Sequence, residues 1–428
     1  MDGRRAKASA DISEFQGTNR IMADLRGLRP VAPILIGASV MLSLAMGLRQ
    51  SLGLFMQPAV QDIGIAVSQF TLAVAVQNLA WGFLQPFAGA IAGRYGFRPV
   101  LMVGVLAYLA GLALLGVAHS AIEVTLGAGV LIGLALACTA SGMALSVASR
   151  PVSPALRSTV LGIVSAAGSL GALIAAPIGQ ILSAGYGWRI GVAGFFLLGL
   201  AMLPAAWAAG RVDAVKLPPA RDDATTAGAA FGLAMRHGPF LVMSGAYFIC
   251  GLQLVFLTTH LPSYLQICGM DPMLAAEALA AIGGFNVLGS LFFGWAGGRW
   301  SKPALLGGIY LMRSLVLAWY FAVPPTPGST LVFASLMGFL WLGVAPLVGG
   351  MTAEMFGLRW QAMVQGLAFT SHQVGSFLGA FGGGLIFDRL GSYDLAWKLG
   401  VGMGLVAGTI QMLAALPRRP GAARPAAA

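Results

Sequence analysis

The feature that most constrains this chain is a repeated alternation of long apolar segments with short polar breaks. A membrane-spanning helix needs about 20 mostly apolar residues, and twelve segments meet that requirement. The predicted spans are 31–60, 68–92, 98–117, 121–149, 157–184, 189–209, 239–266, 272–298, 302–323, 329–355, 361–387 and 395–416. Only 9% of the residues are charged, against about 25% in soluble proteins. The pattern therefore predicts an all-α membrane protein.

The longest polar break, RVDAVKLPPARDDATTAG, divides the twelve predicted helices into two sets of six. The predicted parts are a tail 1–30, a six-helix bundle 31–209, a linker 210–238, a second six-helix bundle 239–416 and a tail 417–428. The loop GAIAGRYGFRP after the second span and the loop GWAGGRWSKP after the eighth have matched glycines, and in both the pair Gly-Arg follows. Matched loops at matched positions indicate an internally duplicated transporter with two pseudo-symmetric halves.

The basic residues predict the orientation. Of the 25 Lys and Arg residues, 20 fall in the tails and in alternate loops on the N-terminal side, three fall on the opposite side, and two lie in the membrane. By the positive-inside rule, both termini and the linker are expected in the cytoplasm, in a multi-pass protein of the cell inner membrane. The net charge of +11 thus reflects short loops and indicates no nucleic-acid partner. We expect a monomer whose surroundings are the lipid bilayer.

The polar residues at membrane depth point to an anion. None of the fourteen acidic residues lies near the centre of a span, whereas Arg49 and Arg313 do lie in spans. A cation at that depth costs at least about 2.5–3.5 kcal/mol unless it faces protein or water. Arg49 is either a snorkelling or packing residue or it faces a central pathway, and we favour the pathway. Its planar fork suits a carboxylate. For Arg313, in the ninth span, a structural role is favoured over a ligand role.

Other polar residues in the spans are candidates for the same pathway. Hydrogen-bonding candidates for the substrate are Gln50, Gln253, Asn286, His372 and Gln373. Each could instead hold helices together, since interhelical polar contacts are common in membranes. His372 is also the proton-coupling candidate, because imidazole titrates near neutrality. His260, just before Pro262, is a candidate for a gate or a kink.

The two repeated loops resemble the loop signature of the major facilitator superfamily, Gly-x-x-x-Asp-Arg-x-Gly-Arg-Arg/Lys. The matching residues, which the resemblance implies to be conformational, are Gly89, Arg94, Gly96, Arg98, Gly294 and Arg299. Gly93 and Gly298 stand where the family usually has aspartate. The resemblance implies two six-helix bundles that rock about a central site.

Within that superfamily the chain is similar to the monocarboxylate-transporter and oxalate/formate-exchanger branch. Arg157-(x)4-Gly162-(x)5-Gly168-Ser-Leu-Gly171 resembles that branch's entry into the fifth span. Arg49 falls where some monocarboxylate porters have a substrate-facing lysine. Two features of the eukaryotic porters are absent: the acid-Gly signature of the first span and the Asp-(x)3-Arg pair of the eighth, where Asn286 and Ser290 stand.

The sequence offers no catalytic triad, metal-ligand spacing or Walker-type loop, so we expect neither an enzyme nor a cofactor. The expected function is secondary active transport of a small organic anion, a mono- or dicarboxylate, by alternating access. Proton symport is favoured over anion exchange. The alternative is a multidrug efflux transporter of the same superfamily. It is weakened by the missing deep acid and by Ala176-Pro177, where efflux families favour Gly-Pro. A third possibility, a non-transporting receptor, gains no support from the duplication.

Overall fold

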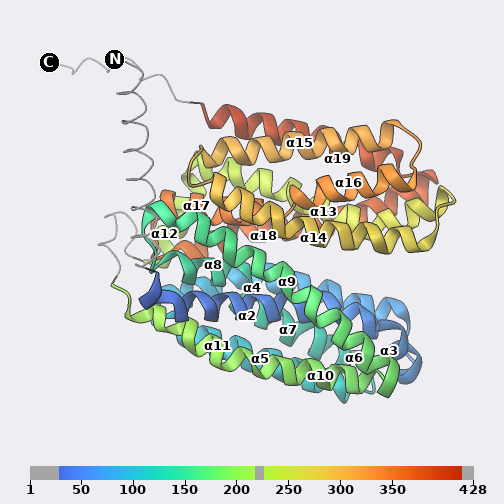
Figure 1. The fold of residues 1–428 in the computed structure, drawn as a ribbon, viewed down its shortest axis with the longest axis horizontal. Coiled ribbons are helices and arrows are strands. Elements are labelled where there is room, and N and C mark those ends of the chain that lie inside the picture. Colours follow the sequence, from blue (N-terminus) through green and yellow to red (C-terminus); the bar gives the residue numbers. More distant parts are fainter. Residues whose placement is uncertain (1–27, 217–225, 417–428) are drawn as a thin grey trace, which may run out of the picture.

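The computed structural model describes residues 28–216 and 226–416, and over these residues it contains helices and no strand (Figure 1). The helices of the N-terminal half are α2 (Ala32–Ser51), α3 (Met56–Ile63), α4 (Val67–Tyr95), α5 (Phe97–Gly116), α6 (Ala121–Val124), α7 (Ile132–Thr139), α8 (Ser141–Ser149), α9 (Pro154–Tyr186), α10 (Trp188–Leu200) and α11 (Met202–Ala209). The linker helix is α12 (Ala227–Arg236). The helices of the C-terminal half are α13 (Gly238–Ile267), α14 (Pro272–Ala296), α15 (Lys302–Ala322), α16 (Pro327–Phe339), α17 (Val344–Phe356), α18 (Gln361–Leu390) and α19 (Asp394–Ala414). The predicted tails 1–30 and 417–428 lie almost wholly outside the described residues.

The predicted all-α membrane fold is confirmed. Ten helical stretches of the described chain are long and apolar enough to cross a bilayer. The remaining two predicted spans correspond to α18 and α19, which have 30 and 21 residues and are therefore also long enough. Polar side chains such as Gln365, His372 and Gln373 lower the hydropathy of α18. A helix that lines a polar pathway is expected to look less apolar than one that faces lipid.

Three of the spans are interrupted. A π-helical segment, Thr125–Leu131, lies between α6 and α7, and Ala140 takes an extended conformation between α7 and α8. In the tenth span the α-helix stops at Phe339 and resumes at Val344. In the first span a 3₁₀ segment, Leu52–Phe55, joins α2 to α3. Such irregular backbone is tolerated at membrane depth where it is buried in protein.

The two halves meet through two equivalent helix crossings, α4 with α18 and α9 with α14 (Figure 1). Glycine makes both crossings possible. A Cβ atom added at Gly89 would overlap the backbone of Ala362 and Met363, and one added at Gly294 would overlap the backbone of Gly162. Small residues let membrane helices approach this closely. Gly89 and Gly294 come from the two repeated loop motifs, so the duplication extends to the packing between the halves.

The end of the molecule at which the linker joins the halves, called here the linker end, carries α8, α12 and α17 (Figure 1). Here Arg150 Nη2 donates to the carbonyl oxygens of Leu358 and Arg359 at 3.4 and 3.3 Å, and Gln361 Nε2 donates to Ser149 Oγ at 3.0 Å. These contacts tie the N-terminal half to the turn between α17 and α18. They form a latch between the halves at the linker end.

The start of α5 is capped by a carboxylate from the linker. Gly96 has a positive φ of 98°, which lets the chain turn from α4 into α5 across one residue. The two oxygens of Asp213 accept hydrogen bonds from the backbone N–H groups of Phe97 and Arg98 at 2.7 and 2.9 Å. An acid is favourable at a helix N-terminus. Asp213 thus places a carboxylate next to the loop whose signature lacks the usual aspartate.

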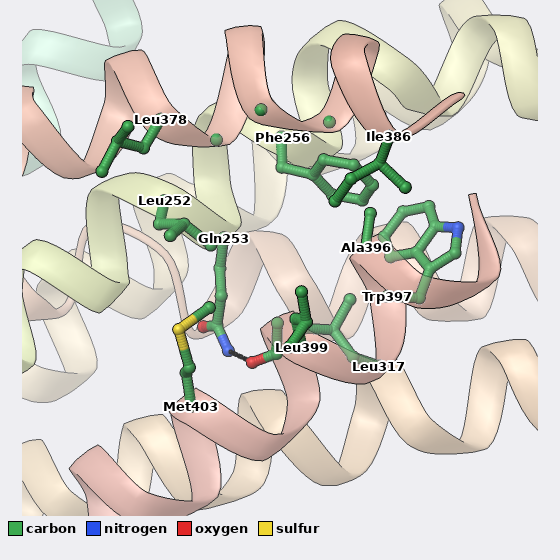
Figure 2. Close-up of a pocket in the computed structure, with 14 residues that line it drawn as sticks. Leu252, Gln253, Phe256, Leu317, Leu378, Ile386, Ala396, Trp397, Leu399 and Met403 are labelled. Atoms are coloured by element: carbon green, nitrogen blue, oxygen red, sulfur yellow. Dashed lines mark hydrogen bonds between the residues drawn. The ribbon is translucent and has the colours of Figure 1, made fainter. Parts of the chain in front are cut away.

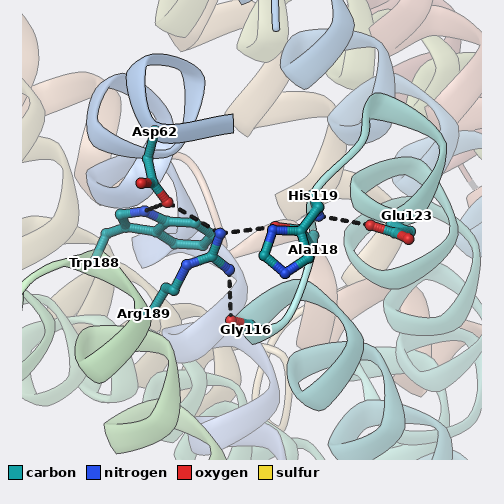
Figure 3. A network of polar contacts seen from close by, with 7 residues as sticks. All are labelled: Asp62, Gly116, Ala118, His119, Glu123, Trp188 and Arg189. Carbon is teal, nitrogen blue, oxygen red and sulfur yellow. Dashed lines mark hydrogen bonds and ion pairs between the residues drawn. The ribbon is translucent and has the colours of Figure 1, made fainter. Parts of the chain in front are cut away.

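The opposite end, called here the far end, carries α3, α6 and α10 (Figure 1). Arg189 binds there to three segments of the N-terminal half (Figure 3). Its guanidinium donates to the carbonyls of Gly116 and Ala118 at 2.8 and 2.9 Å and pairs with Asp62 at 3.0 Å. Trp188 Nε1 donates to the same carboxylate at 3.1 Å. This network fixes the far end of one half and contains no residue of the other half.

Candidate functional site at the junction of the halves

Arg49 lies in the last turn of α2 and points at α4. Its Nη2 donates a hydrogen bond to Asn78 Oδ1, and its Cζ lies 5.0 Å from the centroid of the Trp81 ring. Asn78 Nδ2 donates to the carbonyl of Val74 at 3.0 Å, which orients the amide so that its oxygen faces the arginine. Both partners of the cation are therefore neutral.

The same asparagine connects Arg49 to the C-terminal half. Gln373 Nε2 on α18 donates to the backbone carbonyl of Asn78 at 3.0 Å. Gln373 Oε1 lies 3.3 Å from His372 Nδ1 and accepts from Ser376 Oγ at 3.4 Å. A polar chain thus runs from Arg49 through Asn78 and Gln373 to His372. It crosses from one half to the other near the middle of both α4 and α18.

Aromatic rings cover this polar chain. The Trp81 ring packs on Phe369 with a centroid distance of 4.6 Å, and Phe369 stacks on His372 with a centroid distance of 5.4 Å and an interplanar angle of 12°. Tyr247 of α13 contacts the other side of the imidazole, with a centroid distance of 4.6 Å. The imidazole and the guanidinium are therefore held in fixed positions by apolar surfaces with few polar contacts.

The electrostatics of the junction are those of an uncompensated cation. In residues 28–216 and 226–416 the ion pairs are Arg189 with Asp62 and Lys302 with Glu354, and all four residues lie at helix ends or in loops. Arg49 Nε is buried and has no hydrogen-bond partner in this part of the chain. Such a guanidinium has donors left for a carboxylate, which its fork geometry matches. No cluster of three or more His, Cys, Asp or Glu suited to a metal occurs within the described residues.

The structure brings Arg49, His372 and Gln373 together but places three other candidates elsewhere. Gln50 has an exposed side chain, and no hydrogen bond joins it to another described residue. Asn286 Oδ1 accepts from the backbone N–H of Leu342, at the interruption between α16 and α17. Gln253 Nε2 donates to the carbonyl of Gly400 at 2.8 Å.

Gln253 lines a separate pocket of about 130 Å³ between α13, α18 and α19 (Figure 2). The other walls are apolar and include Phe256, Leu378 and Trp397. Figure 2 shows Gln253 turned toward α19, where Gly400 lies. The pocket therefore belongs to the C-terminal half alone and is distinct from the junction.

His260, the predicted gate, is bound within the C-terminal half. Its Nδ1 lies 3.2 Å from the Tyr393 hydroxyl and its Nε2 lies 2.9 Å from the carbonyl of Ala380. The loop arginines stack on aromatic rings: Arg94 on Tyr95, Arg98 on Trp207 and Arg299 on Trp295, with distances of 5.2, 4.4 and 4.3 Å from Cζ to the ring centroid. Arginine–aromatic contacts of this kind are favourable at membrane interfaces.

Sequence reasoning missed Asn78, Trp81 and Tyr247. Each is a single polar or aromatic residue in a span that contains others of its kind, such as Gln77 and Gln85 in α4. Gln77 Nε2 donates to the carbonyl of Ala128 inside the N-terminal half. One residue of separation thus decides which polar side chain reaches the junction. Helical spacing from Pro86 and Gly89, the inter-half positions of α4, could have identified Asn78 and Gly82 as the same face.

Comparison with known proteins agrees with this architecture. Residues 37–380 match the Major Facilitator Superfamily. Monocarboxylate transporter 13 of Bos taurus is 27% identical over 387 residues, which cover 88% of this chain and 87% of that protein. The fujikurins efflux protein of Gibberella fujikuroi is 25% identical over 345 residues, which cover 77% of this chain and 70% of that protein.

Among solved structures, the E. coli fucose:proton symporter FucP in an outward conformation has a TM-score of 0.72 at 14% identity, and the match covers 90% of this chain and 99% of that one. This likeness concerns the fold. The family match extends over most of the chain and includes both halves of the duplicated bundle. The chain therefore belongs to the major facilitator superfamily and is a multi-pass membrane transporter.

Proposed function

We propose that this transporter moves a small organic anion, a mono- or dicarboxylate, by secondary active transport with alternating access. The observation that carries the proposal is the position of Arg49: a cation with neutral partners, at membrane depth, where the two halves meet. The similarity to a monocarboxylate transporter supports the same substrate class. The substrate leaves chemically unchanged, so the protein is no enzyme and needs no cofactor.

In this proposal the carboxylate of the substrate binds the free donors of the Arg49 guanidinium. A hydrogen bond to a charged group contributes about 1.5–3 kcal/mol, and the fork geometry allows two in parallel. Trp81 and Phe369 provide an apolar wall for the carbon skeleton. Because Asn78 connects Arg49 to Gln373, a bound anion acts on a residue of each half at once. Gln50, Gln253 and Asn286 would join the site only in another conformation.

The contacts between the halves suggest which side is closed. In the described chain, the hydrogen bonds between the halves run from the latch of Arg150 and Gln361 to the Asn78–Gln373 pair at mid-depth. None joins the halves beyond that depth toward the far end. The linker end is thus closed and the far end is the open side in this conformation. Transport would require the latch to break while contacts form at the far end, with His260 near that gate.

We place both termini and the linker in the cytoplasm, in the inner membrane, because 20 basic residues flank one side and three the other. A C-terminal reporter that is active only outside the cytoplasm would contradict this orientation. We further propose that the monomer transports and that the anion is accompanied by a proton. An anion bound at Arg49 offsets the charge of that residue and so favours a protonated His372, and anion and proton then bind together.

The proposal is tested by a thermal-shift screen of purified protein against mono- and dicarboxylates and against lipophilic cations. A ligand that binds only the folded state stabilises it by RT ln(1 + [L]/Kd), about 2.7 kcal/mol at 100 Kd. We expect carboxylates to raise the unfolding temperature. The similarity to an efflux protein gives the second candidate, drug efflux. Stabilisation by lipophilic cations and not by carboxylates would favour efflux and overturn the anion proposal.

A further inference from the structure

The C-terminal half buries a second cation at membrane depth. Arg313 lies near the middle of α15 (Lys302–Ala322), about 15 Å from either end of the helix at a rise of about 1.5 Å per residue. Its side chain is 0% exposed, and it is the largest of the fully buried side chains in the described chain. The position is as deep as that of Arg49, but it is enclosed by one half alone.

The guanidinium of Arg313 has few polar contacts. Nη1 donates to the sulfur of Cys250 at 3.2 Å, and a thiol is a weak acceptor. Nε and Nη2 are buried and have no hydrogen-bond partner among the residues that the structure describes. Buried polar groups are hydrogen-bonded with few exceptions, and an unpartnered charged donor is the costliest exception. Two strong donors of this cation therefore remain available to an acceptor.

The chain supplies no counter-charge at this depth. The helices that pack on α15 include α13, α16, α17 and α19. α13 and α16 contain no acidic residue, and the acids of α17 and α19 are Glu354 near the end of α17 and Asp394 at the start of α19. Glu354 is already paired with Lys302 at the linker end. A charge without an internal partner is expected to be compensated from outside the protein.

A second donor lies beside the guanidinium. Tyr310 precedes Arg313 by three residues, so both side chains lie on one face of α15. The Tyr310 ring centroid lies 5.8 Å from Arg313 Cζ, its side chain is 0% exposed, and its hydroxyl has no hydrogen-bond partner within the described residues. Hydroxyl and guanidinium donors that converge in a buried place are a common way to bind an anion.

A row of side chains connects this place to the junction. Cys250, which accepts from Arg313, follows Tyr247 by three residues on α13. The Tyr247 ring contacts the imidazole of His372, and Tyr247 packs against the apolar cores of both halves. Tyr247 thus separates the junction from the buried cation by the thickness of one side chain.

We propose that Arg313 and Tyr310 form a second anion site, inside the C-terminal half, that takes a small monovalent anion, a short carboxylate or a halide, past Tyr247 from the junction. The site supplies two guanidinium nitrogens and one hydroxyl as donors. Its apolar surroundings favour an anion small enough to be fully desolvated. The site does not depend on the role proposed for Arg49.

The test uses the full-length purified protein with Arg49→Gln, so that binding at the junction is removed. Its unfolding temperature is measured against rising formate, chloride and gluconate at constant ionic strength and pH. We expect a saturable rise with formate or chloride and none with the bulky gluconate. A response to formate alone assigns the site to carboxylates, and a response to chloride as well assigns it to small anions generally. Equal responses to all three salts would overturn the proposal.

Two further variants assign the response to these residues. Arg313→Met, added to the same background, should weaken the apparent anion affinity at least tenfold and still fold, because removing a buried charge is often neutral or stabilising. Tyr310→Phe should weaken the affinity severalfold. Tyr320→Phe is the matched control, since that buried hydroxyl on α15 is already bonded to Thr330 at 2.9 Å, and it should leave the response unchanged. An unchanged response in Arg313→Met would also overturn the proposal.

Discussion

Asn78 joins Arg49 to the opposite half of the molecule: its side-chain oxygen accepts from the guanidinium, and its backbone carbonyl accepts from Gln373. One residue of α4 therefore contacts the cation of α2 and the polar face of α18. A neutral amide at this position orients the guanidinium and leaves its charge uncompensated. That arrangement suits a site whose counter-ion is the substrate.

Asn78→Asp should abolish anion binding, because the new carboxylate would pair with Arg49 and occupy its fork. We expect at least a tenfold loss of carboxylate affinity in thermal-shift titrations. Asn78→Leu is the matched control of similar size: it removes the orienting hydrogen bond but adds no charge, so its loss of affinity should be smaller. Equal affinities in the aspartate variant and the wild type would show that the anion binds elsewhere.

Substitutions at the two inter-half glycines should destabilise the closed linker end. Gly89→Ala and Gly294→Ala place a methyl group against neighbouring backbone, and overpacking of this kind costs about 1–3 kcal/mol. The unfolding temperature should fall in both variants. Gly308→Ala is the control, since a Cβ there meets nothing within 4 Å and alanine favours a helix by about 0.5–1 kcal/mol. A wild-type unfolding temperature for both crossing variants would contradict the packing described.

Loss of the Arg150 latch should open the linker end. Arg150→Gln removes the donors to Leu358 and Arg359, so amide hydrogen exchange in residues 357–366 should become severalfold faster. Arg236→Gln, which removes an exposed charge of the linker helix, is the control. Burial lowers the pKa of Arg150 to about 10, against the opposing effect of the Asp213 carboxylate. Because the guanidinium keeps its proton below that value, the exchange rates should show no dependence on latch protonation between pH 6 and 8. Unchanged exchange in Arg150→Gln would mean that the latch does not hold the halves.

His372→Gln should uncouple transport from protons. In proteoliposomes, uptake driven by a pH gradient should be lost in the variant while counterflow of substrate at equal pH persists, because glutamine can donate a hydrogen bond but cannot carry a proton. His260→Gln is the matched control, since that imidazole is bound to Tyr393 and Ala380 within one half. If His372→Gln still followed the pH gradient as the wild type does, His372 would not carry the proton.

Hydropathy was sufficient to predict the fold, because a long apolar run in a bilayer has few alternatives to a spanning helix. The ends of the observed helices fall within a few residues of the predicted spans, for example Gly238–Ile267 against 239–266. The interruptions near Ala140 and Leu340 were not predicted, since neither has a proline or a charge at the break. They depend on tertiary contacts such as the one between Asn286 and the N–H of Leu342.

The site was only partly predictable, because composition shows which residues are polar but not which of them face each other. Arg49 and His372 stood out as rare groups in apolar spans. Gln253 looked equivalent to Gln373, yet one binds Gly400 inside the C-terminal half and the other binds Asn78 across the junction. The difference arises from how α13 and α18 rotate in the bundle, which a single sequence does not specify.

The measurement that tests the account most directly is carboxylate binding by Arg49 variants, with Lys398→Gln as a control that removes an exposed cation of α19. Arg49→Gln should lose about a hundredfold or more in affinity, since each hydrogen bond to a charged group contributes about 1.5–3 kcal/mol. Arg49→Lys should keep part of the affinity, because the charge remains and the fork is lost. If Arg49→Gln bound and transported carboxylates as the wild type and Lys398→Gln do, Arg49 would not be the anion anchor.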